Sequence, residues 1–489
     1  MSFDFTTYKI IDLSILAVLL VLLTWFLIKH KSNLKKDGIL VLYRTKLGIK
    51  LIDKIGGKYK KTLKVLTYVS ITLGYLLMVG MTYLLGKTIY LYITKPAIVQ
   101  AIKAPPLMPL IPYFPELFGL KSFFPTFYVV YFIVAILIAA TIHEFSHGIF
   151  AKFGKVRIKS TGFAFLKFFP AIFGAFVEQD DKQMNKKSIK TQLAILSAGV
   201  FANIIVTVVF FILLIIYFSL AFNPIGVTFN NYMYSGINIS QITSINGVPI
   251  HNPSSSFILD NLNITDYRNL TRIVVNNNGY FLDNQVFINN VNQTYDLAIV
   301  YNDLPAIRAG LPVQGVITSI DNNKITSAED FSKNIQKFKP GENTIFEVKI
   351  NGEIKDYNIT FADNGNGKAV LGVYSANKPN FLIGEMNHFL VSIRPNNLNL
   401  KDNVYYEPKL GEFTIFIYYL LWWVVLINLL IALFNMLPLG ILDGGRFFQL
   451  TVLKITRSEK VANWLFKFIT YLILIGFLAL MVRWAIGLF

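Results

Sequence analysis

The sequence predicts a polytopic α-helical membrane protein with about six transmembrane helices and an inserted, extracytoplasmic β-rich region. Hydrophobic residues make up 54% of the chain and charged residues 15%, whereas soluble domains contain about 25% charged residues. Several uncharged runs exceed the length of about 20 residues that a helix needs to cross a bilayer. With 489 residues, the chain is long enough for a helical bundle and one or two further domains.

Six apolar segments are expected to cross the membrane. They lie at about residues 11–29, 65–94, 126–150, 191–222, 413–437 and 464–486. No small-residue cleavage site follows the first segment, so we interpret it as a retained helix and not as a signal peptide. These segments define an N-terminal membrane domain over 1–222 and a C-terminal membrane domain over 413–489.

The distribution of lysine and arginine predicts the orientation of these segments. The loop from Lys29 to Lys64 contains twelve Lys or Arg residues against two Asp, and the loop from Lys152 to Lys190 contains nine. Positively charged loops stay on the cytosolic side, so we expect both loops in the cytosol and residues 223–412 outside. We therefore expect a multi-pass protein of the plasma membrane. The net charge of +18 is interpreted as a topology signal and not as a nucleic-acid-binding surface.

The segment 223–412 differs from the rest of the chain in composition. It is rich in Asn, Ser and Thr. It contains five glycosylation sequons, at Asn238, Asn263, Asn269, Asn292 and Asn358. Sequons are used only on external segments, so they favour an extracytoplasmic location, although some would arise by chance in so Asn-rich a stretch.

Two parts of this external segment repeat each other. The sequence ITSINGVPI at 242–250 recurs as ITSIDNNKI at 317–325. After the second copy, the pattern predicts a short helix around Ala328–Phe338 and a β-hairpin that turns at Asn351–Gly352. The repeat indicates two small β units in tandem.

The second β unit resembles a PDZ domain from the Ala-Gly-Leu turn at Ala309–Leu311 onward, and the first resembles a diverged copy. The alternative is a generic small β domain. We expect a diverged PDZ-like unit at 223–298, a PDZ-like domain at 299–375 and a connector at 376–412. PDZ domains bind extended peptides by adding a strand to a sheet edge, so the resemblance implies peptide or protein tails as partners.

A histidine pair at the end of the third apolar segment indicates a metal site. The run TIHEFSHGIF places His143 and His147 four residues apart. Residues at this spacing lie on one face of a helix, where both side chains can reach one ion. Glu144 points in a neighbouring direction, which suits contact with a metal-bound water. The alternative is an ordinary polar cap at the helix end.

A third metal ligand is expected after the fifth apolar segment. The chain contains no cysteine, and its other three histidines lie in expected loops and in the external region. Zinc accepts a carboxylate oxygen beside two imidazoles. Asp443 follows a long uncharged helix, and a carboxylate in such a place is a functional candidate. Pro438 and Gly440 would interrupt the helix there, which a membrane protein tolerates around a cavity.

The motifs HEFSH and FNMLPLGILDGG resemble those of the site-2 protease family of intramembrane zinc metalloproteases. The family pattern is HExxH in one helix and NxxPxxxLDG in a later one. The residues that match its second part are Asn435, Pro438, Leu442, Asp443 and Gly444. The segments GAFVEQDD (174–181) and SAGVFAN (197–203) are similar to two further elements of the family, with Val200 where proline is usual. The resemblance covers about 126–222 and 413–450.

The resemblance implies a mechanism. One Zn²⁺ ion would be held by His143, His147 and Asp443, with a fourth position for water whose pKa the ion lowers. Glu144 would act as the general base. Asn435 would hydrogen-bond the developing oxyanion or the substrate carbonyl. A polar cap at a helix end is the alternative for Asn435.

The implied substrate is a transmembrane helix of another protein in the lipid bilayer, unwound locally because helical peptide bonds are shielded by backbone hydrogen bonds. In the family, the loop after the first zinc helix forms a membrane-associated β structure that can pair with such a substrate. A re-entrant packing loop is the alternative here. The resemblance assigns substrate contacts to Gly174, Phe176 and Asn203.

Two other functions are alternatives to the protease. One is a catalytically inactive, PDZ-bearing membrane adaptor, which would not need Glu144, both histidines and Asp443 together. The other is a transporter, a class that often has repeated helical bundles and charges on several spans. The six apolar segments show no such repeat in their sequence. The sequence therefore favours the enzyme.

Overall fold

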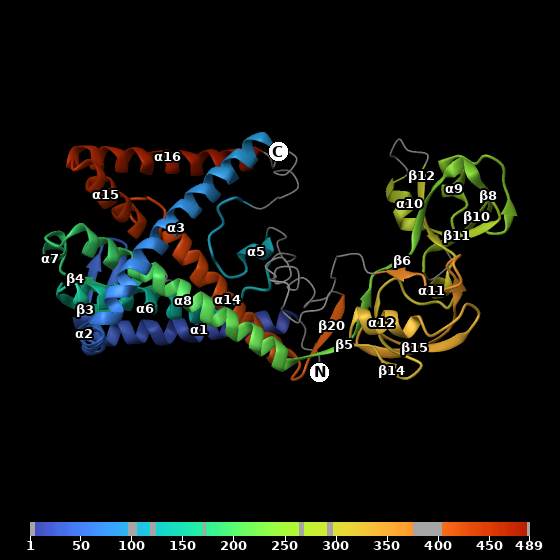
Figure 1. Cartoon of the computed structure of the whole chain (residues 1–489), viewed down its shortest axis with the longest axis horizontal. Coiled ribbons are helices and arrows are strands. Elements are labelled where there is room, and N and C mark those ends of the chain that lie inside the picture. Colours follow the sequence, from blue (N-terminus) through green and yellow to red (C-terminus); the bar gives the residue numbers. More distant parts are fainter. Residues whose placement is uncertain are drawn as a thin grey trace. The chain divides into compact units, whose positions relative to one another are not determined.

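The chain forms two compact units (Figure 1). The computed structural model describes residues 5–95, 105–117, 124–168, 170, 173–263, 268–290, 297–374 and 403–486. The helical unit comprises Met1–Leu220 and Glu412–Phe489, and the β-rich unit comprises Ala221–Gly411. Most of the expected connector at 376–412 and the sequon at Asn292 lie outside the described residues.

Within the described residues, the helical unit contains six helices that are long and apolar enough to cross a membrane. They are α1 (Phe5–Lys29), α3 (Lys60–Thr94), α6 (Val129–Phe153), α8 (Ile189–Ala221), α14 (Glu412–Asn435) and α16 (Glu459–Ile486). The six expected segments are thus confirmed by length and composition, with ends that differ by a few residues. Their direction across the membrane stays a prediction.

The shorter elements of the helical unit are helices and one small sheet. The helices are α2 (Ile49–Lys58), α5 (Phe114–Leu117), α7 (Asp181–Asn185), α15 (Asp443–Thr456) and a 3-10 turn at Lys31–Asn33. The strands are β1 (Leu34–Asp37), β2 (Leu40–Thr45), β3 (Ile158–Leu166) and β4 (Phe173–Gln179). They pair in the order β1-β2-β3-β4, which leaves β4 at an edge.

This small sheet joins two loops that are distant in the sequence. In the antiparallel register, Thr161 of β3 lies opposite Thr45 of β2 and Val177 of β4. The family resemblance implies β structure around β3 and β4, whereas β1 and β2 were expected only as part of a basic loop. The signal for this hairpin is Asp37–Gly38. Gly38 has a φ of 58°, a conformation that glycine adopts without strain.

The core of the helical unit includes several alanines beside its larger aliphatic and aromatic side chains. Ala151 of α6, Ala198 of α8 and Ala432 of α14 have no exposed surface. Small residues let helices approach each other closely inside a membrane. Gly148 of α6 lets α2 approach closely, because a Cβ at this position would lie 2.9 Å from the side chain of Ile52 in α2. As a result, α2 and α8 pack directly on the helix that carries the two histidines.

The start of α6 is held by a carboxylate from α1. Asp12 is 5% exposed, and its Oδ2 accepts hydrogen bonds from the Tyr113 hydroxyl at 2.5 Å and from Val129 N at 2.7 Å. Its Oδ1 accepts a third bond from Val130 N at 3.1 Å. The first N–H groups of a helix have no intrahelical partner, and negative charge is favourable at this end. Asp12 therefore caps α6 from a neighbouring helix.

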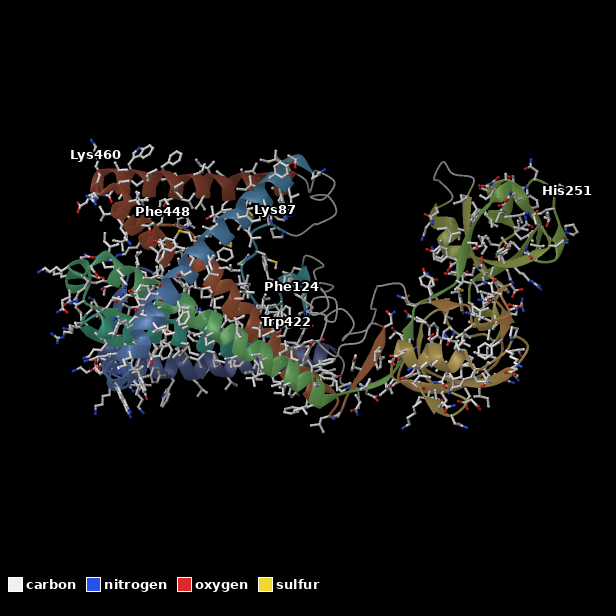
Figure 2. All side chains as sticks on the ribbon, in the orientation of Figure 1. Lys87, Phe124, His251, Trp422, Phe448 and Lys460 are labelled. Atoms are coloured by element: carbon white, nitrogen blue, oxygen red, sulfur yellow. The ribbon has the colours of Figure 1, made fainter. Side chains whose placement is uncertain are left out.

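Aromatic packing joins the start of α6 to α14. Phe127 stacks on Trp423 with ring centroids 3.8 Å apart. Phe124 meets Trp422 edge-on at 6.2 Å, and both side chains are labelled in Figure 2. Offset and edge-to-face pairs add about 0.5–1.5 kcal/mol to the burial of their surface. The segment just before α6 is thus packed against the middle of α14, which ends at Asn435 of the site motif.

The β-rich unit contains two larger sheets. The first has the strand order β7-β12-β11-β10-β8-β9, and the second has β16-β15-β13-β5-β20 with β14 paired to β13. The strands of the first sheet are β7 (Tyr234–Asn238), β8 (Ile242–Ile245), β9 (Val248–Pro249), β10 (Leu270–Val275), β11 (Asn278–Asp283) and β12 (Leu297–Asn302). Those of the second are β5 (Phe222–Phe229), β13 (Gly315–Ile320), β14 (Asn323–Lys324), β15 (Asn343–Ile350), β16 (Glu353–Thr360) and β20 (Val404–Pro408).

The remaining elements of this unit are short. Its helices are α9 (Ser255–Asp260), α10 (Asn284–Asn290), α11 (Pro305–Arg308), α12 (Ala328–Ile335) and a 3-10 turn at Ile239–Gln241. Two further strand pairs are β6 (Asn231–Tyr232) with β19 (Val373–Tyr374), and β17 (Ala362–Asp363) with β18 (Ala369–Val370).

The repeat seen in the sequence is also a repeat of structure. Each copy begins with a tight hairpin, β8–β9 or β13–β14, followed by a helix, α9 or α12, and a longer hairpin, β10–β11 or β15–β16. The expected helix near residue 328 and the turn at Asn351–Gly352 are confirmed. Both turn residues have positive φ, 51° and 91°, as a two-residue hairpin loop requires.

The strands are not divided between the sheets at residue 298. β5 lies in the range expected for the first unit, yet it pairs with β13 and β20 of the second sheet. β12 crosses the expected boundary and pairs with β7 and β11 of the first sheet. The PDZ character of the two units stays a prediction.

Candidate metal centre

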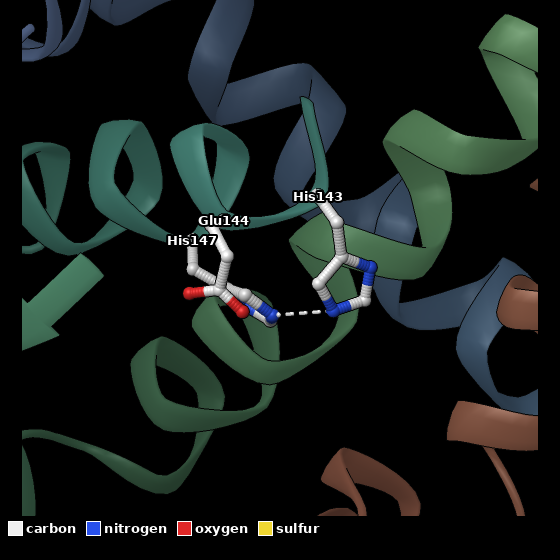
Figure 3. Close-up of side chains that lie close together, drawn as sticks. All are labelled: His143, Glu144 and His147. Carbon is white, nitrogen blue, oxygen red and sulfur yellow. Dashed lines mark hydrogen bonds between the residues drawn. The ribbon is translucent and has the colours of Figure 1, made fainter. Parts of the chain in front are cut away.

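Three side-chain atoms converge beside the last turns of α6. The Nε2 atoms of His143 and His147 lie 3.0 Å apart (Figure 3), and Oδ2 of Asp443 lies 3.2 Å from each. Ligand atoms at about 2.0–2.1 Å from a tetrahedral zinc ion would be roughly 3.3 Å apart. Both histidines are only 6% exposed. The spacing and the chemistry of these three atoms therefore fit a zinc ion.

The orientation of His147 is fixed from α8. Its Nδ1 donates a hydrogen bond to the carbonyl oxygen of Ile195 at 2.6 Å. The proton is thus assigned to Nδ1, and the lone pair of Nε2 faces His143 and Asp443. This is the arrangement that a histidine needs in order to bind a metal through Nε2.

Asp443 reaches the histidines because the chain turns sharply between α14 and α15. The turn needs two glycines, since a Cβ on Gly444 would collide with the carbonyl of Leu437 and one on Gly445 with the carbonyl of Leu439. Burial acts to raise the pKa of Asp443, but without a bound cation the two imidazoles, when protonated, outweigh this effect by their charge and hydrogen bonds and lower the pKa below its ordinary value. The carboxylate is therefore kept in the ionised form that binds cations.

Glu144 is tied to the edge of the small sheet. Its Oε2 accepts a hydrogen bond from Val177 N of β4 at 3.0 Å. The ligand atoms of His143, Glu144 and His147 lie within 4.8 Å of one another. The glutamate thus lies close to the histidines, and its carboxylate is positioned by main chain from another element.

A cavity of about 260 Å³ opens at this site. Its walls come from α6, the end of α14 and the turn before α15. The lining residues are Ala140, His143, Glu144, Ile431, Asn435, Ile441, Leu442 and Asp443. Ile441 is 94% exposed, so the cavity is open on that side. Four of the eight lining residues are polar and four are apolar, and such convergence of polar groups in a cavity is typical of a ligand site.

Asn435 is the last residue of α14 and lies in this cavity wall. Its Nδ2 is 3.5 Å from Nε2 of His143. The structure therefore brings together five residues predicted from the sequence: His143, Glu144, His147, Asn435 and Asp443.

The three residues predicted to contact substrate lie outside the cavity lining. Gly174 and Phe176 are in β4, which touches the site through Val177. A Cβ on Gly174 would meet no atom of the described residues within 4 Å, so these residues leave space beside it. Asn203 is buried in α8 with no exposed surface. The substrate roles of these residues stay predictions.

Gly199 lies against both imidazoles, and its role was not predicted from the sequence. A Cβ at this position would be 2.5 Å from Nε2 of His147 and 2.6 Å from Nε2 of His143. Only glycine leaves room for the two rings. The signal was present in the segment SAGVFAN, whose glycine belongs to the family element, but its contacts come from another helix.

Apolar spanning helices with two buried histidines beside a partly buried glutamate and aspartate define a membrane metallopeptidase. The model of Peptidase family M50, the site-2 protease family, matches residues 131–477, and the chain belongs to this family. Peptidases of this family use zinc. Membership supports a membrane-embedded metalloprotease and does not favour an adaptor or a transporter.

Two curated proteins are similar to the chain. A protein of Methanocaldococcus jannaschii, named as uncharacterized, is 32% identical over 206 residues, which are 40% of this chain and 49% of that protein. A protein of Clostridium perfringens with the name "Putative zinc metalloprotease" is 28% identical over 210 residues, which are 38% of this chain and 60% of that protein. The matches thus span about half to three fifths of the relatives' own length.

Proposed function

We propose that the chain is an intramembrane zinc metalloprotease that hydrolyses peptide bonds within transmembrane segments of other proteins, in regulated intramembrane proteolysis. The observation that carries the proposal is the convergence of His143, His147 and Asp443 at a cavity that also holds Glu144. Asp443 comes from 300 residues after His143, so this donor set exists only in the folded bundle. Such a set is suited to metal-assisted hydrolysis.

In the proposed enzyme, His143, His147 and Asp443 hold one Zn²⁺ ion. When bound, the ion supplies a Lewis acid that polarises a carbonyl group and lowers the pKa of water. Two imidazoles and one carboxylate leave a position open for the reactants, as in other zinc hydrolases.

Glu144 acts first as a general base and then as a general acid. Its carboxylate takes a proton from the attacking water and passes it to the amine nitrogen that leaves. The hydrogen bond from Val177 N, at 3.0 Å, keeps the carboxylate in place between these steps. The base and β4 are therefore fixed relative to each other.

Asn435 stabilises the negative charge that develops on the carbonyl oxygen. Its Nδ2 lies 3.5 Å from Nε2 of His143, in the cavity wall, where it can donate to an oxygen bound beside the histidines. One such donor is worth roughly 3 kcal/mol in a transition state. A polar cap on α14 is the alternative role, and it agrees with the position of Asn435 as the last helical residue.

The edge of β4 receives the unwound substrate as an additional strand. Among the described strands, β4 pairs only with β3, and Val177 N–H points away from β3 toward Glu144. An unwound helix in hydrocarbon needs partners for its backbone groups, and a strand edge supplies them. In this proposal, Gly174 and Phe176 border the substrate strand, and the open space beside Gly174 leaves room for it.

The wider setting is part of the same proposal. The substrates are transmembrane proteins that share the bilayer with the enzyme. The enzyme resides in the plasma membrane, with its active site near the cytosolic side and the β-rich unit outside. The two PDZ-like units bind the tails of substrates or other proteins.

The test is a cleavage assay with the full chain purified in detergent and a panel of tagged single-span substrates. Wild type is compared with Glu144→Gln, each with and without a zinc chelator. Glu353→Gln is the matched control, because its side chain is 77% exposed in the β-rich unit. We expect wild type and the control to release a fragment whose mass places the cut inside the span, and we expect chelation to abolish it.

Two results would contradict the proposal. Cleavage by Glu144→Gln at the wild-type rate would remove Glu144 from the chemistry. Fragments cut only outside the spanning segment would show that the enzyme is a membrane-bound protease that does not cleave within the membrane.

A further inference from the structure

A buried asparagine of α8 makes no side-chain hydrogen bond to any described residue. Asn203 has no exposed surface, and within the described part of the chain neither its Oδ1 nor its Nδ2 has a partner. The Nδ1 atom of His143 is also buried and has no partner among these residues. Buried polar atoms in proteins are nearly always hydrogen-bonded. Unpaired groups of complementary kind, a ring N–H and an amide oxygen, therefore call for an explanation.

Three residues of α8, spaced four apart, lie on one face of the helix. The first two contact the histidines. The carbonyl of Ile195 accepts the Nδ1 proton of His147 at 2.6 Å. Gly199 lies against both rings, at the distances where a Cβ would touch their Nε2 atoms. Asn203 is the next residue on this face.

The order of these contacts places His143 toward Asn203. His147 bonds to Ile195 of α8. His143 lies one turn earlier on α6, and it contacts Gly199, which lies one turn later on α8. The two helices are therefore antiparallel where they touch. In Figure 3, Nε2 of His143 faces His147, and Nδ1 lies on the far side of the ring.

We propose that Asn203 is a positioning residue whose amide oxygen accepts the Nδ1 proton of His143, and so holds Nε2 of that ring toward the metal. The contact would give both atoms the hydrogen-bond partner that they lack within the described residues. Histidines that bind metals donate their other ring N–H to a carbonyl or carboxylate, which fixes the tautomer and the ring orientation. Ile195 does this for His147 through its main chain, and Asn203 does it for His143 through its side chain.

This inference rests on the zinc site of the proposed function and deepens it. It gives Asn203 a different role from the substrate contact that the family resemblance implies. Asn203 is absent from the cavity lining, so its amide does not face the space where a substrate carbonyl would lie. Its partner is therefore the ligand and not the substrate.

The experiment measures zinc affinity of the full chain in detergent, by competition with a chromophoric chelator after removal of bound metal. Asn203→Leu removes the acceptor at similar volume, and Asn203→Asp keeps an acceptor oxygen. Asn428→Leu is the matched control, since Asn428 is an equally buried asparagine of α14 whose Oδ1 also lacks a partner. We expect Asn203→Leu to bind zinc about 10–100-fold more weakly, with Asn203→Asp and Asn428→Leu close to wild type.

Several outcomes would overturn the inference. They are wild-type zinc affinity in Asn203→Leu, equal losses in Asn203→Leu and Asn203→Asp, and an equal loss in Asn428→Leu. A raised KM in Asn203→Leu with unchanged zinc affinity would return Asn203 to the substrate. If the leucine variant does not fold, Asn203→Ala is titrated with the same expectations. A wild type that binds no zinc would instead contradict the proposed function itself, so the two failures are distinguishable.

Discussion

At the scale of single residues, Gly199 shows how closely the two histidines are enclosed. Replacing it by alanine would place a methyl group 2.5 Å from Nε2 of His147 and 2.6 Å from Nε2 of His143. Overpacking of this kind costs about 1–3 kcal/mol, and here the strain falls on the ligand atoms. We expect Gly199→Ala to weaken zinc binding and slow cleavage by about tenfold or more, measured by zinc titration and by fragment release.

Gly80→Ala is the matched control for this prediction. Gly80 lies in α3, where a Cβ would meet nothing within 4 Å. Alanine is about 1 kcal/mol more favourable than glycine inside a helix, so this variant should be at least as stable as wild type and should bind zinc equally well. Wild-type zinc affinity in Gly199→Ala would mean that the imidazoles have room to move.

Asp12 is expected to contribute stability and not chemistry. Asp12→Leu would leave the main-chain donors at the start of α6 unsatisfied, which costs about 1–3 kcal/mol for buried groups. We expect a lower unfolding temperature in detergent, followed by circular dichroism. Ser14→Ala, at an exposed position of the same helix, should leave the unfolding temperature unchanged. If both variants unfold at the wild-type temperature, the cap from α1 is dispensable.

A site residue can be predicted from the sequence only when its residue type and its local spacing carry the signal. His143 and His147 are recognisable because their spacing is a property of one helix, and Asp443 because its surroundings are uncharged. The other groups that hold the site cannot be recognised in this way. The carbonyl of Ile195 and the N–H of Val177 are main-chain groups that every residue carries. The need for glycine at 199 arises only when α6 is packed against it.

At the scale of secondary-structure elements, the edge of β4 that faces away from β3 carries the substrate proposal. Val177 N–H points away from β3, and N–H groups alternate along a strand, so Ala175 N–H points to the same edge. Proline at 175 removes this donor without removing those that bond to β3, and edge strands tolerate proline. We expect Ala175→Pro to lower kcat/KM for a single-span substrate by about tenfold, a loss of roughly 1.4 kcal/mol, with zinc affinity unchanged.

Ala175→Val tests whether the donor or the side chain matters. Valine keeps the N–H group and suits a strand, so this variant should cleave at nearly the wild-type rate. Equal losses in the two variants would point to side-chain volume at 175 and away from strand addition.

The long helices were predictable as elements, whereas the small sheet was predictable only in part. An uncharged run of about 20 residues has few stable alternatives to a spanning helix. β1 and β2 are short, and Lys35 and Lys36 lie within β1. β2 pairs with β3 through Thr45 and Thr161, more than a hundred residues apart. A strand whose partner is so distant carries little local signal, apart from its turn.

At the scale of the whole molecule, the absence of cysteine makes the predicted orientation directly testable. Lys54 of α2 and Lys355 of β16 are both exposed, and either can be changed to a single cysteine. A membrane-impermeant maleimide should label Lys355→Cys on intact cells. It should label Lys54→Cys only after permeabilisation, because the basic loop stays in the cytosol. The reverse pattern would contradict the proposed orientation.

The pairing of β5 with β20 determines how the β-rich unit is joined to the chain. β5 follows α8 directly and β20 precedes α14, with Phe222 opposite Pro408. Lys409 N donates a hydrogen bond to the carbonyl of Ala221 at 2.9 Å. The points where the chain enters and leaves this unit are therefore neighbours, as is common for inserted domains. The unit could therefore be deleted or exchanged. A turn of a few residues, or another domain with adjacent ends, could replace it without changing the path of α8 or α14.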